Sequence, residues 1–476
     1  MNKNLILLTT GRVSQMFIMF FTYRVLSSVL SVPEMGIYYF LLSISAGFGL
    51  IYANPIGMYT NRMLHGWLEH GALQKNLKIV LYSFLVGSFL TIPLLFIFRD
   101  KISLEGQSLF SLIAVLVFYV FSTTLNGTVI PSLNFLGFTK HFVIWTFLTN
   151  ALGLVFSYTL VRFVAPGPIN WLIGQAVAFF LCGVIALLIL FFKTKVQSEK
   201  QIAPTALNGR LKRVLSFAFP VVITNVAVWS LGQSFRFFYK ENIDLTILGE
   251  LAFGLGVATS LSVAVEYLLQ QFYFPEFYRD ISNPAKDSGA VWNQLLNKLI
   301  PPYIFLMMFL IGLSPFIMQV LADVKFKNAY QYLALGAVVE ILRMLGNIFT
   351  MATQSEMKTH KAIVPYLSGG AVTVIGVLFI CRHPEYVRMT PFCLMAGYLV
   401  SLINLRFNVG KIIKVEMNYK AFLKAFMLSL VFLTAQFFST FSSSMTYSIL
   451  IAGFYGLIFA FFMYQSYLQG KMEQEV

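Results

Sequence analysis

Stretches of about twenty apolar residues recur along almost the whole chain of 476 residues. A helix that crosses the hydrocarbon core of a bilayer needs roughly 20 such residues. The chain is 11% charged, whereas soluble domains carry about 25% charged residues. We therefore expect an all-α polytopic membrane protein with about fourteen transmembrane helices, near 5–31, 36–61, 79–98, 108–133, 142–161, 171–192, 214–239, 245–270, 299–321, 329–354, 362–381, 391–408, 421–441 and 446–467.

The distribution of Lys and Arg predicts the orientation of these spans. The first run is longer than a signal-peptide core and no small-residue cleavage site follows it, so we expect it to be retained. With the N-terminus inside, the inner segments hold 22 basic residues and the outer segments hold 8. The positive-inside rule then places both termini in the cytoplasm. The net charge of +15 thus indicates membrane topology rather than nucleic-acid binding.

Four basic residues remain, and all four are arginines inside predicted spans. A charged side chain in hydrocarbon costs at least about 2.5–3.5 kcal/mol, so such residues usually face a cavity or a partner. Guanidinium groups bind phosphate oxygens in pairs and stay protonated. Because the first six predicted spans contain no Asp or Glu, these arginines predict a cationic lumen for an anionic substrate: Arg12, Arg24, Arg236 and Arg343. Arg24 and Arg236 also fall near the outer ends of their spans, where a long side chain can reach the interface.

Polar residues repeat at helical spacing in several spans. In the tenth span, Glu340, Arg343 and Asn347 share one face, and the first two can pair at i,i+3. Glu266 in the eighth span and Glu340 are candidates for coupling to protons or sodium, or for structural pairing. Amides and hydroxyls taken singly are more typical of hydrogen bonds between helices. The residues predicted to line the lumen are Gln15, Asn54, Asn126, Asn225, Gln233 and Asn347.

A short internal repeat suggests two halves. An arginine follows an aromatic residue at Arg24 and at Arg236, with a glycine 12 residues later at Gly36 and 13 residues later at Gly249. Parallel repeats with the substrate site between them are a transporter architecture. The predicted organisation is a six-helix lobe at 1–192, a basic cytoplasmic linker at 193–213, a second six-helix lobe at 214–410, and two additional helices with a short tail at 411–476.

Motifs of catalysis and metal binding are missing from the sequence. There is no Gly-rich phosphate loop, no Ser/His/Asp set and no His cluster, so we expect neither an enzyme nor a metal site. The cysteines match no metal spacing. Cys381 and Cys393 could pair on one outer face, although buried free thiols are the simpler interpretation.

Three segments carry a family resemblance: SVPEMGIYYF at 31–40, GFGLIYANPIGMYTNR at 47–62 and LSFAFPVVITNVAVWSLGQSFRFFYK at 215–240. They resemble the polysaccharide flippases, the O-antigen-type lipid-linked oligosaccharide transporters of the MATE-like multidrug/oligosaccharidyl-lipid/polysaccharide superfamily. Many such flippases have twelve spans, whereas the peptidoglycan-precursor flippases resemble this chain in having fourteen.

The resemblance implies two six-helix lobes arranged as a V in the bacterial inner membrane. It implies transfer of a polyprenyl-pyrophosphate-linked oligosaccharide from the inner to the outer leaflet by alternating access, for O-antigen, lipopolysaccharide or related surface polysaccharide biosynthesis. The arginines would hold the pyrophosphate, while the amides and Trp229 would line the path of the sugars. A polysaccharide polymerase and a chain-length regulator would be partners. No bound cofactor is expected, and a proton or sodium gradient would supply the energy.

Three alternatives stay open. One is a cation-coupled multidrug antiporter on the same fold. Another is a flippase for a peptidoglycan lipid precursor. The third is a non-transporting scaffold for glycan assembly, in which the polar faces would pack tightly against one another.

Overall fold

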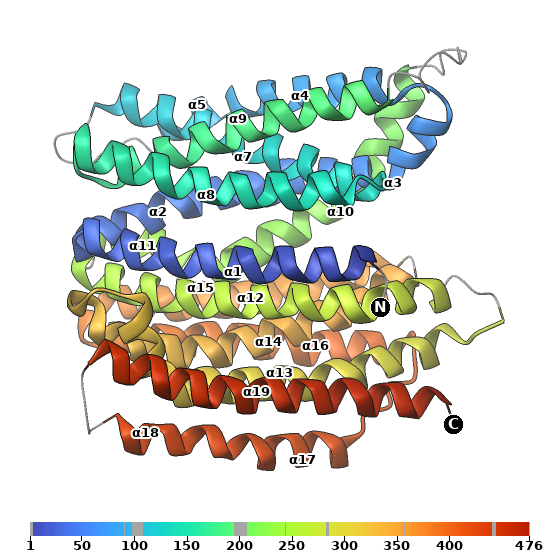
Figure 1. Ribbon diagram of the computed structural model, residues 1–476. Helices are drawn as coiled ribbons and strands as arrows, with labels where there is room; N and C mark the ends of the chain where they lie inside the picture. The colour runs from blue at the N-terminus through green and yellow to red at the C-terminus, as the bar shows by residue number, and fades with distance from the viewer. Residues whose placement is uncertain are drawn as a thin grey trace. The chain divides into compact units, whose positions relative to one another are not determined.

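The computed structural model describes residues 3–89, 91–97, 108–194, 207–242, 244–281, 285–356, 358–439 and 444–475. Every regular element within these ranges is a helix (Figure 1). The elements are α1 Lys3–Val29, α2 Val32–Phe48, η1 Gly49–Ala53, α3 Asn54–Glu69, α4 Leu73–Phe89, α5 Thr91–Ile97, α7 Leu109–Phe135, α8 Thr139–Phe163, α9 Pro168–Thr194, α10 Leu207–Gln233, α11 Phe235–Asn242, α12 Leu245–Ile281, α13 Ser288–Leu321, η3 Val324–Ala329, α14 Tyr330–Ser355, η4 Thr359–Ala362, α15 Ile363–Arg382, η5 Pro384–Met389, α16 Thr390–Gly410, α17 Tyr419–Ser429, η6 Leu430–Thr434, α18 Ala435–Phe438 and α19 Met445–Glu475.

Among the described residues, 12 helical segments are long and apolar enough to cross a membrane. The two other predicted spans correspond to α1, which has 27 residues and carries Arg12 and Arg24, and to α10, whose apolar part is the shorter Phe219–Gln233. The prediction of an all-α polytopic membrane protein is therefore confirmed. Helices predominate because lipid offers the backbone no hydrogen-bond partners, so each segment must bond to itself.

The chain divides into two compact units, Met1–Trp229 and Ser230–Val476. In the first unit, α7, α8 and α9 pack closely around a core that includes Leu125, Cys182 and Leu190. The interface of α8 and α9 depends on Gly174, because a Cβ there would collide with the backbone of Ser157. The Ser157 hydroxyl donates to the Trp171 carbonyl at 2.8 Å.

The second predicted span is three consecutive elements, α2, η1 and α3. Ser31 and Glu34 form a capping box at the start of α2. The middle element, η1, is π-helical, with the amide of Asn54 donating to the carbonyl of Gly49. Such insertions widen a helix locally and interrupt its regular ladder.

Two side chains of α10 bond to this second span. The Asn225 amide donates to the Leu50 carbonyl at 2.6 Å, and the Trp229 indole N–H donates to the Ser43 carbonyl at 2.9 Å. These bonds place α10 as far as Trp229 in the first unit. The predicted linker at 193–213 lies largely outside the described residues, and 207–213 begin α10.

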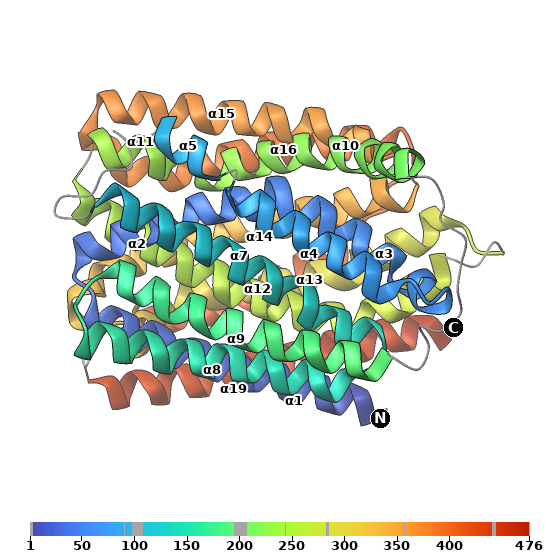
Figure 2. The same cartoon turned by 90° about the horizontal axis from the view of Figure 1, so that it is seen from above.

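In the second unit, α13 packs against α12, α14, α17 and α19. Figure 2 shows the same helices from above, with α12, α13 and α14 in the middle of the view. Its buried Trp292 donates to the Ile348 carbonyl of α14 at 3.0 Å. Both α12, with 37 residues, and α13, with 34, extend beyond the predicted spans at 245–270 and 299–321. Asp287 explains the early start of α13, since its carboxylate accepts from the Ala290 amide at 2.9 Å.

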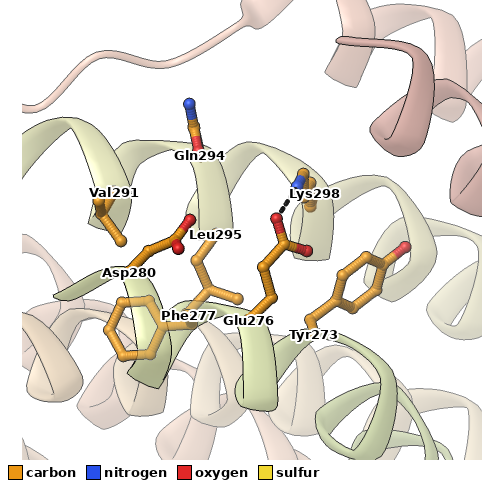
Figure 3. A pocket seen from close by; sticks show the side chains of 8 residues that line it. All are labelled: Tyr273, Glu276, Phe277, Asp280, Val291, Gln294, Leu295 and Lys298. Atoms are coloured by element: carbon orange, nitrogen blue, oxygen red, sulfur yellow. Dashed lines mark ion pairs between the residues drawn. The ribbon is translucent and has the colours of Figure 1, made fainter. Parts of the chain in front are cut away.

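The extended ends of α12 and α13 enclose a small pocket (Figure 3). Glu276 of α12 faces Lys298 of α13 across it, with Oε1 and Nζ 3.7 Å apart. Asp280, one turn further along α12, lies 2.8 Å from Lys286 Nζ. Ion pairs between acids of α12 and lysines therefore hold these two helix ends together at the pocket.

The last two predicted spans correspond to α17, η6 and α18, followed by α19. The segment 414–418, which has no regular secondary structure, precedes them and is bonded to two asparagines of α13. Asn293 donates to the Lys414 carbonyl and accepts from the Glu416 amide, both at 2.8 Å. Asn297 donates to the Glu416 carbonyl at 3.0 Å and accepts from the Asn418 amide at 2.9 Å. Asn418 then caps α17.

The two copies of the sequence repeat have the same local structure. A helix ends five residues after Arg24, at Val29, and six residues after Arg236, at Asn242. The next helices begin at Val32 and at Leu245, each after a polar cap, with Asp244 accepting from the Thr246 amide at 2.8 Å. The one-residue shift in sequence is thus kept in the structure.

We expect Gly397→Ala to destabilise the second unit by about 1–3 kcal/mol, the usual cost of overpacking a tight contact. A Cβ at Gly397 of α16 would collide with Thr373 and with the Gly369 carbonyl of α15. The matched control is Gly453→Ala in α19, where a Cβ meets nothing within 4 Å. Thermal unfolding of the purified proteins in detergent compares the two, and equal melting temperatures would refute the close approach of α15 and α16.

Candidate functional site

A buried ionic cluster joins α12 to α14 in the second unit. The Arg343 side chain lies between two carboxylates, with Nε 2.7 Å from Glu340 Oε2 and Nη2 2.9 Å from Glu266 Oε2. Both glutamates are only 5% exposed. The predicted pairing of Glu340 with Arg343 is confirmed. The second carboxylate belongs to Glu266, a residue predicted for coupling or structural pairing. Its contact with Arg343 was not predicted, because Glu266 lies 77 residues away on another helix.

The remaining carboxylate oxygens of the cluster are also hydrogen-bonded. Asn347 donates to Glu266 Oε1 at 3.0 Å, and Thr259 donates to Glu340 Oε1 at 2.7 Å. Helical spacing explains the arrangement: Thr259 and Glu266 are two turns apart on α12, while Glu340, Arg343 and Asn347 follow one stripe of α14. All four carboxylate oxygens therefore have a donor within the protein.

The cluster holds two acids and one base, so it carries a net charge of −1 when all three groups are ionised. An uncompensated charge in a low-dielectric interior is costly unless a cation or a proton balances it. The electrostatics of this site thus favour a cation rather than an anion. This is the reverse of what Arg343 alone predicts from the sequence.

Tyrosines from neighbouring helices surround the cluster, and no sequence pattern pointed to them. Tyr366 of α15 bonds to the Thr350 hydroxyl at 3.0 Å. Tyr303 of α13 and Tyr398 of α16 are buried near Arg343. Twenty-three tyrosines are spread over the chain, so the residue type alone gave no signal for these positions.

Arg236 lies in the same unit at the start of α11. It is 7% exposed, donates to the Gln233 side chain and lies 5.3 Å from the centre of the Phe235 ring. The structure thus brings together two of the predicted residues, Arg236 and Gln233. Gln233 is the last residue of α10, and Arg236 follows in α11 after a turn at Ser234.

The first unit holds Arg12 and Arg24, both on α1. Arg12 donates to Gln15 at 2.9 Å and lies 5.7 Å from the centre of the Phe142 ring on α8. Arg24 is half-buried, and its carbonyl accepts from the Ser27 hydroxyl at 3.0 Å. Twelve residues of helix separate the two arginines by about 18 Å along its axis. They therefore lie at different depths of the span.

The predicted lining amides have varied surroundings. Asn126 bridges three helices of the first unit, donating to Thr149 of α8 at 3.2 Å and to the Phe179 carbonyl of α9 at 3.1 Å. Asn225 bonds to the second span, whereas Asn54 is exposed at the start of α3. Helix–helix bonding accounts for Asn126 and Asn225, the role that is commonest for such residues in membranes.

The three cysteines are free thiols: Cys182, Cys381 and Cys393. Within the described ranges, no group of three or more His, Cys, Asp or Glu could hold a metal ion. The possible pairing of Cys381 with Cys393 is therefore not made.

No family model and no curated protein sequence matches the chain. Solved structures do. A lipid II flippase, MurJ, in an inward closed conformation aligns with a TM-score of 0.61 at 15% identity, covering 97% of this chain and 99% of that chain. An inward-facing multidrug resistance MATE family transporter of the MOP superfamily aligns with a TM-score of 0.53 at 14% identity, covering 90% and 98%. The chain therefore has the fold that these transporters share.

We expect Arg343→Met to destabilise the second unit by about 3–5 kcal/mol, because it leaves two buried carboxylates without their cation. The triple variant Glu266→Gln, Glu340→Gln, Arg343→Met should recover most of this loss, since it removes all three charges. Thermal unfolding in detergent measures both. Lys414→Gln, which removes an exposed ion pair with Glu416, is the control and should unfold as the parent does. A triple variant no more stable than the single one would show that the charges do not compensate one another.

Proposed function

We propose that the protein is a flippase that moves a polyprenyl-pyrophosphate-linked oligosaccharide from the inner to the outer leaflet of the bacterial cytoplasmic membrane. The substrate would serve O-antigen or another surface polysaccharide. Transport would proceed by alternating access, without chemistry on the substrate. A polysaccharide polymerase and a chain-length regulator are the proposed partners on the product side.

The surroundings of Arg12 carry this proposal. The side chain is part-buried in a 27-residue helix, against an amide and an aromatic ring. The six predicted spans of the first lobe contain no Asp or Glu, so its intramembrane charge is positive. A pyrophosphate is the anionic part of the proposed substrate, and its oxygens fit the paired donors of a guanidinium. The lipid tail would stay in the bilayer, where it needs no protein cavity.

The likeness to MurJ supports a lipid-linked substrate, since the name of that protein is lipid II flippase. The alignment covers nearly the whole of both chains. Each of the fourteen predicted spans corresponds to a helical segment of this chain. A peptidoglycan lipid precursor therefore remains an alternative substrate. It shares the pyrophosphate and the polyprenyl chain with the oligosaccharide lipid, and the two differ in the group that the pyrophosphate carries.

The arginines need not share one role. Arg343 lies between two carboxylates, so we propose that it holds the ionic cluster together rather than the headgroup. Arg12, with Arg24 and Arg236, remains the proposed headgroup ligand. Because Arg12 and Arg24 differ in depth along α1, they would contact the pyrophosphate at successive stages of its passage.

The net negative cluster is the proposed coupling site. Glu266 and Glu340 together exceed the charge of Arg343 by one, so a proton or a sodium ion would neutralise the site. Binding of that cation would shift the balance between the conformations of the transporter, provided that its affinity differs between them.

A cation-coupled multidrug antiporter is the second candidate function. The net negative charge of the cluster favours it, and the inward-facing MATE transporter shares the fold. Uptake of a cationic dye into proteoliposomes, set against transfer of a fluorescent lipid-pyrophosphate oligosaccharide, separates the two functions. The flippase proposal requires the second signal and not the first.

We expect Arg12→Ala to slow transfer of the lipid-linked oligosaccharide in proteoliposomes by about tenfold or more, the effect of losing a hydrogen bond to a charged group. Arg12→Lys should retain part of the rate, since charge remains but the paired geometry is lost. The control is Thr22→Ala on the same helix, since the Thr22 hydroxyl bonds back to the Ile18 carbonyl. Normal transfer by Arg12→Ala would remove Arg12 from the headgroup site.

We expect Glu266→Gln and Glu340→Gln each to reduce the response of transport to an imposed gradient. The glutamine keeps the side-chain size but not the charge that would attract a cation. Proton and sodium gradients are applied separately to proteoliposomes. The control is Glu250→Gln, the other acid of the eighth predicted span, which lies on the same helix outside the cluster. An undiminished gradient response in both cluster variants would remove these glutamates from coupling.

A further inference from the structure

The π-helical segment of the second span has an unusual hydrogen-bond pattern. In η1 the bonds run over five residues, and the last one joins the Asn54 amide to the Gly49 carbonyl. The next bond of this series would join the amide of residue 55 to the Leu50 carbonyl. Residue 55 is proline, which has no N–H. The backbone of the second span therefore cannot supply this donor.

A side chain from another helix occupies the position of that donor. Asn225 of α10 is 175 residues away in sequence, and its Nδ2 lies 2.6 Å from the Leu50 carbonyl oxygen. A carbonyl left unbonded inside a membrane protein is costly, and neighbouring side chains commonly satisfy carbonyls that proline frees. Asn225 thus bonds to the carbonyl that Pro55 leaves without a backbone donor. This explains why an amide side chain lies in the middle of the seventh predicted span.

The surroundings of the segment leave it room to bend. A Cβ built on Gly49 or on Gly57 meets nothing within 4 Å, so neither glycine is packed against a neighbour. A proline and a π-helical insertion are the usual causes of bending in a helix, and both occur here within a few residues. Asn54, a predicted lining residue, lies between them and is exposed.

Asn225 lies close to the end of the first unit. Asn225 lies one turn before Trp229, the last residue of the first unit, and α10 continues from there into the second. A movement of α10 would therefore stretch or break the bond to Leu50. The bond is a single contact between side chain and backbone, so it can open without unfolding either helix.

We propose that Asn225 is a positioning residue, whose amide replaces the N–H that Pro55 lacks and holds the second span in the π-helical form that transport requires. This inference rests on the proposed function for its transport part only. Its structural part stands on the bond between Asn225 and Leu50.

The experiment is a double-mutant cycle read by hydrogen–deuterium exchange of residues 45–60 in the full-length protein. Asn225→Leu should raise the exchange of the amides around η1 by roughly three- to tenfold, the effect of one lost hydrogen bond. Pro55→Ala returns a backbone N–H to the second span. In the Pro55→Ala background, Asn225→Leu should therefore change the exchange little. An equal rise in both backgrounds would overturn the replacement of the proline donor by Asn225.

Trp229→Phe is the matched control. It removes the other bond between the same two helices, to the Ser43 carbonyl, while keeping an aromatic ring beside Gly47. No proline lies within one turn after Ser43. The effect of Trp229→Phe on exchange should be the same in the parent and in the Pro55→Ala background, which would show that the coupling is specific to Asn225.

Transport by the same variants tests the positioning role. In proteoliposomes, Asn225→Leu should slow transfer of the lipid-linked oligosaccharide, and adding Pro55→Ala should restore it. Normal transfer by Asn225→Leu, despite raised exchange, would overturn the positioning role. If the parent protein transfers none of the lipids offered, the proposed function fails, while the exchange measurements still decide the role of Asn225.

Discussion

Hydrocarbon offers no hydrogen bonds, and this constraint explains most of what the chain does with its polar groups. Many hydroxyls within the spans bond back to their own helices, as Thr60 does to Ile56 and Thr146 to Phe142. Amides bridge between helices, as Asn126 does. Where regular helical bonding is interrupted, at Pro55, an amide from another helix takes over. Each of these polar side chains thus has an identified hydrogen-bond partner.

The same constraint sorts the intramembrane charges into two kinds. The second unit carries acids and bases together, and there the charges combine into a cluster with every oxygen bonded. The predicted spans of the first lobe carry bases alone, and Arg12 lies against an amide and a ring. A cluster in which every carboxylate oxygen has a donor holds α12 and α14 together. A guanidinium in a region without acids suits the recognition of an anion.

The fold could be predicted from the sequence because hydropathy acts over whole spans, and an error of several residues does not change the number of helices. The bounds of α12 and α13 could not, since ion pairs such as Glu276 with Lys298 stabilise polar helix ends that hydropathy assigns to loops. Spacing within one helix predicted the pair Glu340 and Arg343. The approach of Glu266 depends on how α12 packs against α14, and periodicity contains no information about that. The role of Pro55 was equally invisible, because it requires the π-helical register.

The geometry of α13 explains how the segment 414–418 is attached to it by hydrogen bonds. Two asparagines one turn apart on α13 are separated by about 6 Å along the axis, and two residues of an extended strand advance by nearly the same distance. Each side-chain amide therefore bonds like one peptide group of a neighbouring strand, and α13 offers a helix face that a strand can join. The final helices are consequently fixed to the longest helices of the second unit by a ladder in which one edge is made of side chains. A rigid attachment of this kind would carry the terminal pair along with every movement of α13.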